Sequence, residues 1–215
     1  WLPQLLNNGD IILTTKPSGG VVGYSYRYNT ATKALVRLVR EEKGLTTLAN
    51  ASGGRMLYGE NGSDGALLGA YNSIGSGGDE GLLSHENTLP LSALPEKCVW
   101  LADGIHTLCG SFTLTRKELL PDLWYQGALS LSDTFWSVNT DTNDVAFLAD
   151  PKTSIEQEFD IMSPVVSVNE RYFVFINKKD GSLWSFHIPQ TTTNAEDTSV
   201  TPPDEILDTQ GSVSQ

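Results

Sequence analysis

The sequence predicts an all-β protein built from many short antiparallel strands. Twenty glycines and ten prolines, with abundant Asn, Asp, Ser and Thr, imply many turns and hence many short elements. Between these turns lie segments that are rich in Tyr, Phe, Trp, Val, Ile and Thr, the residues that favour strands. A chain of 215 residues, 39% of them hydrophobic, can bury a core as one large β domain or two small ones.

The expected strands follow one another along the chain. They lie at 10–17, 23–30, 45–52, 54–61, 65–72, 96–103, 105–112, 133–140, 144–150, 163–170 and 171–188, and the last of these segments holds a hairpin. The segment 33–43, KALVRLVREEK, fits a helix because Ala34, Leu35, Leu38 and Val39 follow a 3.6-residue period. It also fits a strand, and its neighbours favour a strand.

Four of these segments share a frame when they are aligned on an asparagine. Each has an aromatic-rich strand that ends at Asn29, Asn61, Asn139 or Asn177, then a turn, then a second strand. β-Hairpin units that recur every 40 to 50 residues or so are typical of propeller blades. The sequence therefore predicts a β-propeller-like fold.

Several expected strands are apolar on both faces. In KCVWLAD, Cys98 and Trp100 face one way while Val99 and Leu101 face the other. A sheet with one face in water would alternate apolar and polar residues. Sheets stacked against one another on both faces would not need to, so this pattern also favours a propeller.

The segment 167–188, SVNERYFVFINKKDGSLWSFHI, resembles the inner strand, turn and DGSLW hairpin of WD40-like and TolB-like β-propeller repeats. The segments LPEKCVW and HTLCG look like those of propeller-type bacterial envelope proteins. The resemblance implies a fold and brings no catalytic residues with it. The Gly-His and Trp-Asp dipeptides of WD40 repeats proper are missing, so the scaffold roles of that subfamily are not implied. About four blades are expected, at 8–43, 44–90, 95–150 and 155–188, either as a small propeller or as the C-terminal part of a larger one.

The two cysteines lie in KCVWLADGIHTLCG. If Asp103-Gly104 forms a two-residue type I′ turn, Cys98 and Cys109 lie opposite each other on neighbouring strands, close enough for a disulfide. Counting outward from that turn makes them a hydrogen-bonded pair, which is the wider kind and less suited to a bridge. A structural disulfide is the favoured interpretation. Buried free thiols, or a reactive pair, remain open.

No cofactor or metal site is predicted. His106, the nearest further candidate for a zinc ligand, would point to the other face of the cysteine sheet. NTDTND at 139–144 has the alternating oxygen side chains of a calcium loop but carries Asp144 where such a loop needs Gly, so a polar turn is the simpler interpretation. No Gly-x-Ser-x-Gly elbow occurs, which leaves a serine hydrolase without support.

Trp124 and Tyr125 are the residues predicted to form a recognition surface. They lie in the irregular segment TRKELLPDLWYQG, between expected strands, where loops often carry binding residues. The alternative is that these aromatic side chains belong to the core.

The net charge of −12 opposes binding to nucleic acid or anionic lipid. Residues 189–215 carry five acids and neither Lys nor Arg, and are expected to form a flexible acidic tail. No apolar run reaches the roughly 20 residues that a transmembrane helix needs. The first residue is not Met, which suggests a fragment or a processed form.

From these patterns we expect a non-catalytic binding or scaffold module, secreted or associated with the cell envelope. It would bind a protein, peptide or glycan through its blade loops. The alternative is a propeller hydrolase, or the accessory propeller of a peptidase, with part of its site in missing blades. A purely structural surface component is a third possibility. The cysteine pair is the only guide to the compartment, since disulfides persist in oxidising environments.

Overall fold

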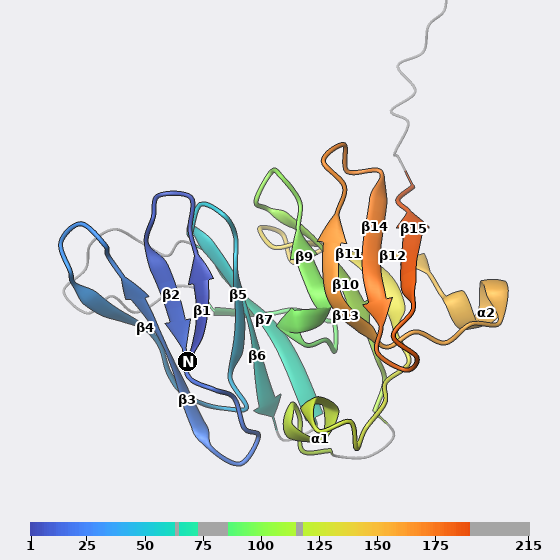
Figure 1. Ribbon diagram of the computed structural model, residues 1–215, viewed down its shortest axis with the longest axis horizontal. Coiled ribbons are helices and arrows are strands. Elements are labelled where there is room, and N and C mark those ends of the chain that lie inside the picture. Colours follow the sequence, from blue (N-terminus) through green and yellow to red (C-terminus); the bar gives the residue numbers. More distant parts are fainter. Residues whose placement is uncertain (63–64, 73–85, 115–117, 190–215) are drawn as a thin grey trace, which may run out of the picture.

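The computed structural model describes residues 1–62, 65–72, 86–114 and 118–189. In these residues the chain forms four antiparallel sheets, each made of consecutive strands, and the sheets follow one another across the molecule (Figure 1). The predicted all-β, propeller-like fold of about four blades is confirmed. None of the helices described is long and apolar enough to cross a bilayer.

The strands are joined mostly by short hairpins. The first sheet holds β1 (Leu2–Leu5), β2 (Ile11–Thr14), β3 (Val22–Tyr28) and β4 (Leu35–Lys43), and the second holds β5 (Thr46–Ala49), β6 (Arg55–Gly62), β7 (Gly65–Asn72) and β8 (Glu86–Thr88). The third sheet holds β9 (Cys98–Trp100), β10 (His106–Ser111), β11 (Thr134–Asn139) and β12 (Val145–Ala149), and the fourth holds β13 (Ile161–Val166), β14 (Tyr172–Asn177) and β15 (Leu183–His187). Three short helices complete the fold: the 3₁₀ turn η1 (Pro95–Lys97), α1 (Asp122–Tyr125) and α2 (Pro151–Ile155).

The first strand, β1, lies before residue 8, where the first blade was expected to begin. It is an edge strand and contains Pro3, which an edge strand tolerates because one side of it makes no sheet hydrogen bonds. The segment 33–43 is a strand, β4, as its neighbours suggested. Of the predicted tail, only Pro189 lies within the described residues.

Hydrophobic cores lie between consecutive sheets. One joins the first and second sheets, one the second and third, and one the third and fourth; the last is built largely of aromatic side chains, namely Phe135, Phe159, Phe173, Phe175, Trp184 and Phe186. Cys98 and Cys109 contribute to the core between the second and third sheets, while Val99 and Leu108 contribute to the next one. Strands β9 and β10 of the third sheet thus pack against cores on both faces, as their sequence predicted.

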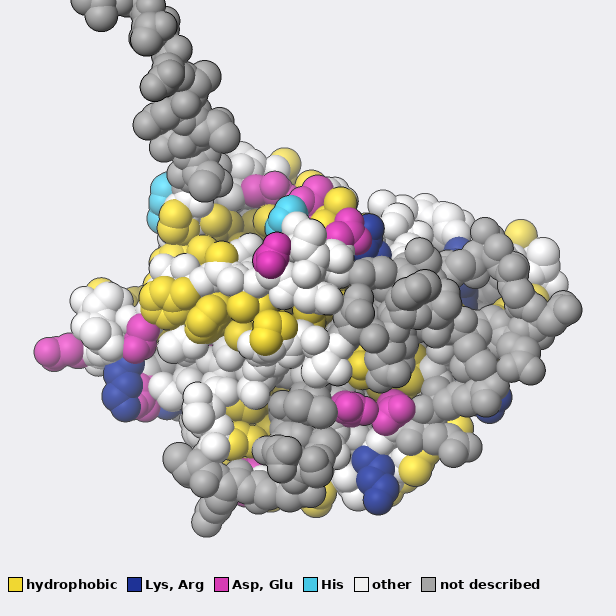
Figure 2. Space-filling view, turned by 180° about the vertical axis from the view of Figure 1, so that it is seen from behind, with side chains coloured by type: hydrophobic (Ala, Val, Ile, Leu, Met, Phe, Trp, Pro, Cys, Tyr) yellow, Lys and Arg dark blue, Asp and Glu magenta, His cyan; other side chains and the backbone are white. Residues whose placement is uncertain are grey.

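The two end sheets differ, because each has a face that no described sheet covers. Tyr172 and Leu183 on the fourth sheet are exposed at 45% and 73%, and Leu5 and Leu35 on the first at 76% and 56%. Figure 2 shows hydrophobic side chains gathered on the side of the molecule that carries the last two sheets. Burial on both faces therefore describes the inner sheets and not the ends.

Each of the four asparagines does precede a hairpin between two paired strands, namely β3–β4, β6–β7, β11–β12 and β14–β15. These hairpins are not equivalent, however, because Asn29 and Asn139 lie at the third strands of their sheets, whereas Asn61 and Asn177 lie at second strands. What Asn29, Asn139 and Asn177 share is local: each side-chain Oδ1 accepts a backbone N–H two residues later. Asparagine supports tight turns of this kind at any place in a sheet, so aligning on it mixed hairpins from opposite ends of the blades.

A disulfide joins Cys98 and Cys109, and the predicted register is confirmed, since these residues are direct partners in the β9–β10 ladder. The predicted turn is wrong. Gly104 N–H donates to Leu101 O at 3.0 Å, and Leu101 N–H donates to His106 O at 2.8 Å. Counting from the Leu101–His106 pair makes the cysteines a non-hydrogen-bonded pair, and their Cα atoms are only 4.1 Å apart. This narrower kind of pair suits a bridge better than the wide pair predicted.

Candidate functional site

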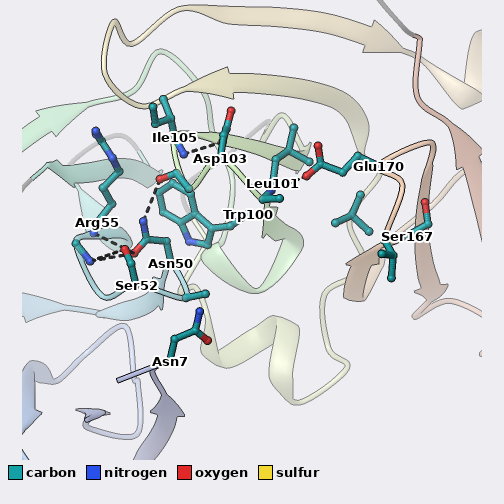
Figure 3. A pocket seen from close by; sticks show the side chains of 16 residues that line it. Asn7, Asn50, Ser52, Arg55, Trp100, Leu101, Asp103, Ile105, Ser167 and Glu170 are labelled. Atoms are coloured by element: carbon teal, nitrogen blue, oxygen red, sulfur yellow. Dashed lines mark hydrogen bonds between the residues drawn. The ribbon is translucent and has the colours of Figure 1, made fainter. Parts of the chain in front are cut away.

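A groove of about 910 Å³ lies where one hairpin from each of the four sheets meets the others. It is lined by Asn7 after β1, by 50–55 at the β5–β6 turn, by 100–105 at the β9–β10 turn and by 166–170 at the β13–β14 turn. In each sheet this is the hairpin between the first two strands. Figure 3 shows side chains from these separate turns pointing toward a common space. We call this site the mouth groove.

The four hairpins share one backbone geometry. In each, the N–H of the fourth turn residue donates to the carbonyl of the first, and the fourth residue is left-handed: Gly9 to Leu6, Gly53 to Asn50, Gly104 to Leu101 and Glu170 to Ser167, with φ of +84°, +69°, +66° and +53°. Glycine adopts this conformation without steric cost. The sequence carries a matching signal that the asparagine alignment overlooked, namely LNNG at 6–9, NASG at 50–53, LADG at 101–104 and SVNE at 167–170.

Hydrogen bonds join each hairpin to the next around the groove. Asn7 N–H donates to Ala51 O at 2.8 Å, Asn50 Nδ2 donates to Gly104 O at 3.0 Å, and Ala102 N–H donates to the carboxylate of Glu170. Glu170 is the one non-glycine at the left-handed position, and its side chain makes the last of these links. The wall of the mouth groove is therefore continuous from the first sheet to the fourth.

The groove combines apolar and polar walls. Trp100, Leu101, Ile105, Val166 and Val168 supply the apolar part. Trp100 Nε1 donates to Leu48 O at 3.1 Å, which fixes the indole in the wall. Val168 is fully exposed at 106%. Val168 thus adds exposed apolar surface to the edge of the groove.

One ion pair and one histidine–aspartate contact flank the groove. Arg55 contacts Asp141 on the third sheet, and His106 Nδ1 lies 2.6 Å from Asp103 Oδ2. Partial burial raises the pKa of Asp103, but hydrogen bonds from the backbone and side chain of His106 outweigh it and hold this pKa below its ordinary value. His106 Nε2 accepts a hydrogen bond from Asn139 Nδ2 at 3.1 Å, so both ring nitrogens are engaged.

The predicted recognition residues, Trp124 and Tyr125, lie in α1 at the opposite end of the sheets from the groove. Trp124 is only 3% exposed, and its Nε1 donates to Asp160 Oδ1 at 2.7 Å. Tyr125 is 43% exposed, and its hydroxyl donates to Glu96. Burial raises the pKa of Tyr125, and the nearby charge of Glu96 raises it further. A partner could reach Tyr125 in this conformation, but Trp124 would first have to leave the core.

The α1 segment contacts several sheets. Asp122 accepts a hydrogen bond from Gly19 N–H, in the β2–β3 connection of the first sheet. At Gly19 a Cβ atom would lie 2.4 Å from Leu120 O, so only glycine allows this close approach. Through Trp124 the same segment reaches Asp160, directly before the fourth sheet. The segment therefore connects the first and last sheets.

No protein-family model matches the sequence, and no curated protein matches it. Solved structures do match in fold. Hydrazine synthase from Kuenenia stuttgartiensis matches with a TM-score of 0.62 at 12% identity, over 86% of this chain and 52% of that one. TolB from Acinetobacter baumannii matches with a TM-score of 0.54 at 14% identity, over 86% and 40%. The tricorn protease matches with a TM-score of 0.52 at 10% identity, over 86% and 20%.

The chain thus spans about half, or less, of the length of these structures. At identities this low, the likeness concerns the fold alone. The fold of these structures agrees with the four consecutive antiparallel sheets of this chain and with the hydrophobic cores between them. The protein therefore has the fold of a TolB-like β-propeller.

Proposed function

We propose that this propeller is a non-catalytic binding module that holds a segment of a protein, a peptide or a glycan in the mouth groove. The observation that carries the proposal is the convergence of four equivalent hairpins on one groove with the exposed Val168 at its edge. Pockets that combine apolar walls with a few placed polar groups are the usual sites of ligand recognition.

The engagement of His106 supports binding rather than hydrolysis. A general base needs a ring nitrogen that can reach the substrate, and both nitrogens of His106 face protein atoms, in Asp103 and Asn139. The carboxyls whose pKa burial raises, Glu96 and Asp133, do not line the groove. The groove thus supplies contacts and shape, and catalysis is the weaker interpretation.

We also propose that the protein works outside the cytoplasm. The Cys98–Cys109 disulfide supports this, since structural disulfides persist in oxidising compartments and are rare where thiols are kept reduced. The acidic net charge of −12 favours partners other than nucleic acid.

The test is a screen of the purified chain against immobilised linear peptides and, in parallel, against a glycan array. Each hit would be measured in solution through the tryptophan fluorescence, because Trp100 lines the groove. A Val168→Glu variant places a charge at the apolar edge and is expected to weaken binding at least about 10-fold. Val21→Glu is the matched control, because Val21 is 62% exposed in the β2–β3 connection, away from the groove.

The proposal predicts saturable binding that Val168→Glu weakens and Val21→Glu leaves unchanged. Two results would contradict it: no saturable binding in either screen, or binding that both variants weaken equally. Which array yields the hits would also decide between a peptide and a glycan.

A further inference from the structure

A lysine and two aspartates lie buried together between the third and fourth sheets. Lys97 Nζ lies 2.6 Å from Asp133 Oδ2 and 2.6 Å from Asp160 Oδ1. Lys97 and Asp160 are fully buried, and Asp133 is only 3% exposed. Lys97 ends η1, Asp133 precedes β11 and Asp160 precedes β13. We call these three residues the buried triad.

The two carboxyl groups are held differently. Both oxygens of Asp160 have further partners: Oδ1 accepts from Trp124 Nε1 at 2.7 Å, and Oδ2 accepts from Leu131 N–H at 3.1 Å. Asp133 Oδ2 accepts from Lys97 and from Ile161 N–H, each at 2.6 Å. Asp133 Oδ1 has no hydrogen-bond partner among the described residues. A buried oxygen without a partner is rare and calls for a physical explanation.

Two aromatic rings lie beside the ammonium group of Lys97. Lys97 Nζ lies 5.0 Å from the centre of the Trp124 ring and 6.0 Å from that of Phe112. One ammonium cannot balance two carboxylates, and an excess buried charge is costly. Burial accordingly raises the pKa of Asp133 and favours its neutral carboxylic acid. The triad then holds one ammonium, one carboxylate and one acid.

We propose that Lys97 and Asp133 condense into an intramolecular isopeptide bond within the folded protein. The amine, the acid and a second carboxylate that can accept a proton are already in direct contact. Holding reacting groups in this way replaces the entropy cost of an encounter in solution. The proposal is independent of the function assigned to the mouth groove.

The step balances without any co-reactant. Lys97 Nζ passes one proton to the carboxylate of Asp160, and the free amine attacks Cγ of the Asp133 acid. The Nζ–Cγ bond forms, the nitrogen releases a second proton to Oδ1, and the bond from Cγ to Oδ1 breaks, so that this oxygen leaves as water. Asp160 finishes as the neutral acid. Charge develops on Asp133 Oδ2 during the attack, and the N–H of Ile161 donates to that oxygen.

The product accounts for the unpartnered oxygen. Oδ1 leaves with the water, while Oδ2 stays as an amide oxygen that keeps its bond from Ile161. The ammonium charge also disappears from the apolar interior. The new bond would tie the start of β9 to the start of β11 and so close the loop that carries α1.

The test is the intact mass of the full chain, measured after unfolding and after reduction of the disulfide. The expected mass is lower than that of the sequence by one molecule of water. Proteolysis should give a branched peptide that joins the segments of Lys97 and Asp133, and trypsin should no longer cleave after Lys97.

Variants separate the roles of the three residues. Asp133→Asn should give a product of the same mass as the cross-linked wild type, because the amide loses ammonia in place of water. Lys97→Met should keep the full mass of its own sequence. Lys152→Met is the matched control, since Lys152 lies in an exposed ion pair with Glu158, and it should still lose water.

A wild-type chain that keeps its full mass after prolonged incubation in the folded state would overturn the proposal. This mass measurement uses the wild-type chain alone, so it does not depend on whether any variant folds. Asp160→Asn tests the proton acceptor: the folded variant should condense at least about 10-fold more slowly. Condensation at the wild-type rate would remove Asp160 from the step.

Discussion

The side-chain amide of Asn50 donates to the carbonyl of Gly104 at 3.0 Å and so joins the second and third sheets at the mouth groove. The same side chain organises its own turn, because Asn50 Oδ1 accepts from Gly54 N–H at 3.0 Å and from Arg55 N–H at 3.2 Å. Asn50 is only 5% exposed. One residue thus fixes both the shape of its hairpin and the position of the next.

Replacement of Asn50 by Ala should lower the free energy of unfolding by about 2 kcal/mol, because several half-buried backbone groups lose their partner at once. Asn50→Asp keeps the acceptor but loses the donor to Gly104, and its charge would face a carbonyl oxygen. Urea denaturation measures both variants. An Asn50→Ala variant as stable as the wild type would show that water satisfies these groups equally well.

The disulfide should contribute less than its loop length suggests. The chain-entropy model gives about 3 kcal/mol for a loop of this size. The β9–β10 ladder already holds Cys98 and Cys109 opposite each other, so we expect the double variant Cys98→Ala, Cys109→Ala to lose about 1 to 2 kcal/mol. Urea denaturation with and without reductant measures this loss. An unchanged midpoint after reduction would contradict the expectation.

Glu158 should show a strongly lowered pKa. Hydrogen bonds and charge from Lys152 and Lys179 lower the pKa of Glu158 from 4.5 to about 2. The folded state then binds this proton less tightly than the unfolded state, so the stabilisation is present above about pH 4.5 and is lost as the pH falls toward 2.

The double variant Lys152→Ala, Lys179→Ala should return the pKa of Glu158 toward its ordinary value, as measured by NMR titration of the side-chain carboxyl. Lys16→Ala serves as the control, since Lys16 lies in the first sheet's β2–β3 connection. A wild-type pKa near 4.5 would contradict the ion pairs seen here.

Glu96→Gln should stabilise the protein at neutral pH. Burial raises the pKa of Glu96, although the Tyr125 hydroxyl partly offsets this effect. The folded state therefore binds the proton more tightly than the unfolded state, and the wild type loses stability as the pH rises above about 4.5. Gln removes this titration, so the variant should unfold at a higher temperature at pH 7, with a smaller difference near pH 4. A difference that does not change with pH would contradict this cause.

Local pattern predicted much of the fold. The β9–β10 register follows from an Asp-Gly turn and two cysteines, and β4 follows from the strands around it. The turn type was predicted wrongly because an Asp-Gly pair fits two types of turn. Both types keep the same strand register, but they exchange the narrow, non-hydrogen-bonded residue pairs with the wide, hydrogen-bonded ones. Only the backbone hydrogen bond from Gly104 to Leu101 distinguishes them.

The site was harder to predict, because its residues are close only in space. Trp124 is an aromatic residue in an irregular segment, and only the fold shows that Asp160 lies within reach of its indole. Lys97 is likewise far along the chain from Asp133 and Asp160. The hairpins of the mouth groove did leave a sequence signal, because glycine occupies the left-handed fourth position in three of them. In the fourth hairpin this position is Glu170, so the glycine pattern is incomplete.

The α1 segment has a consequence for the distant end of the molecule. It contacts the first sheet through Asp122 and reaches the fourth through Trp124, although no described core joins those two sheets. These two hydrogen bonds tie the first and fourth sheets to one short segment. A substitution at Asp122 would therefore change the width of the mouth groove without touching any residue that lines it.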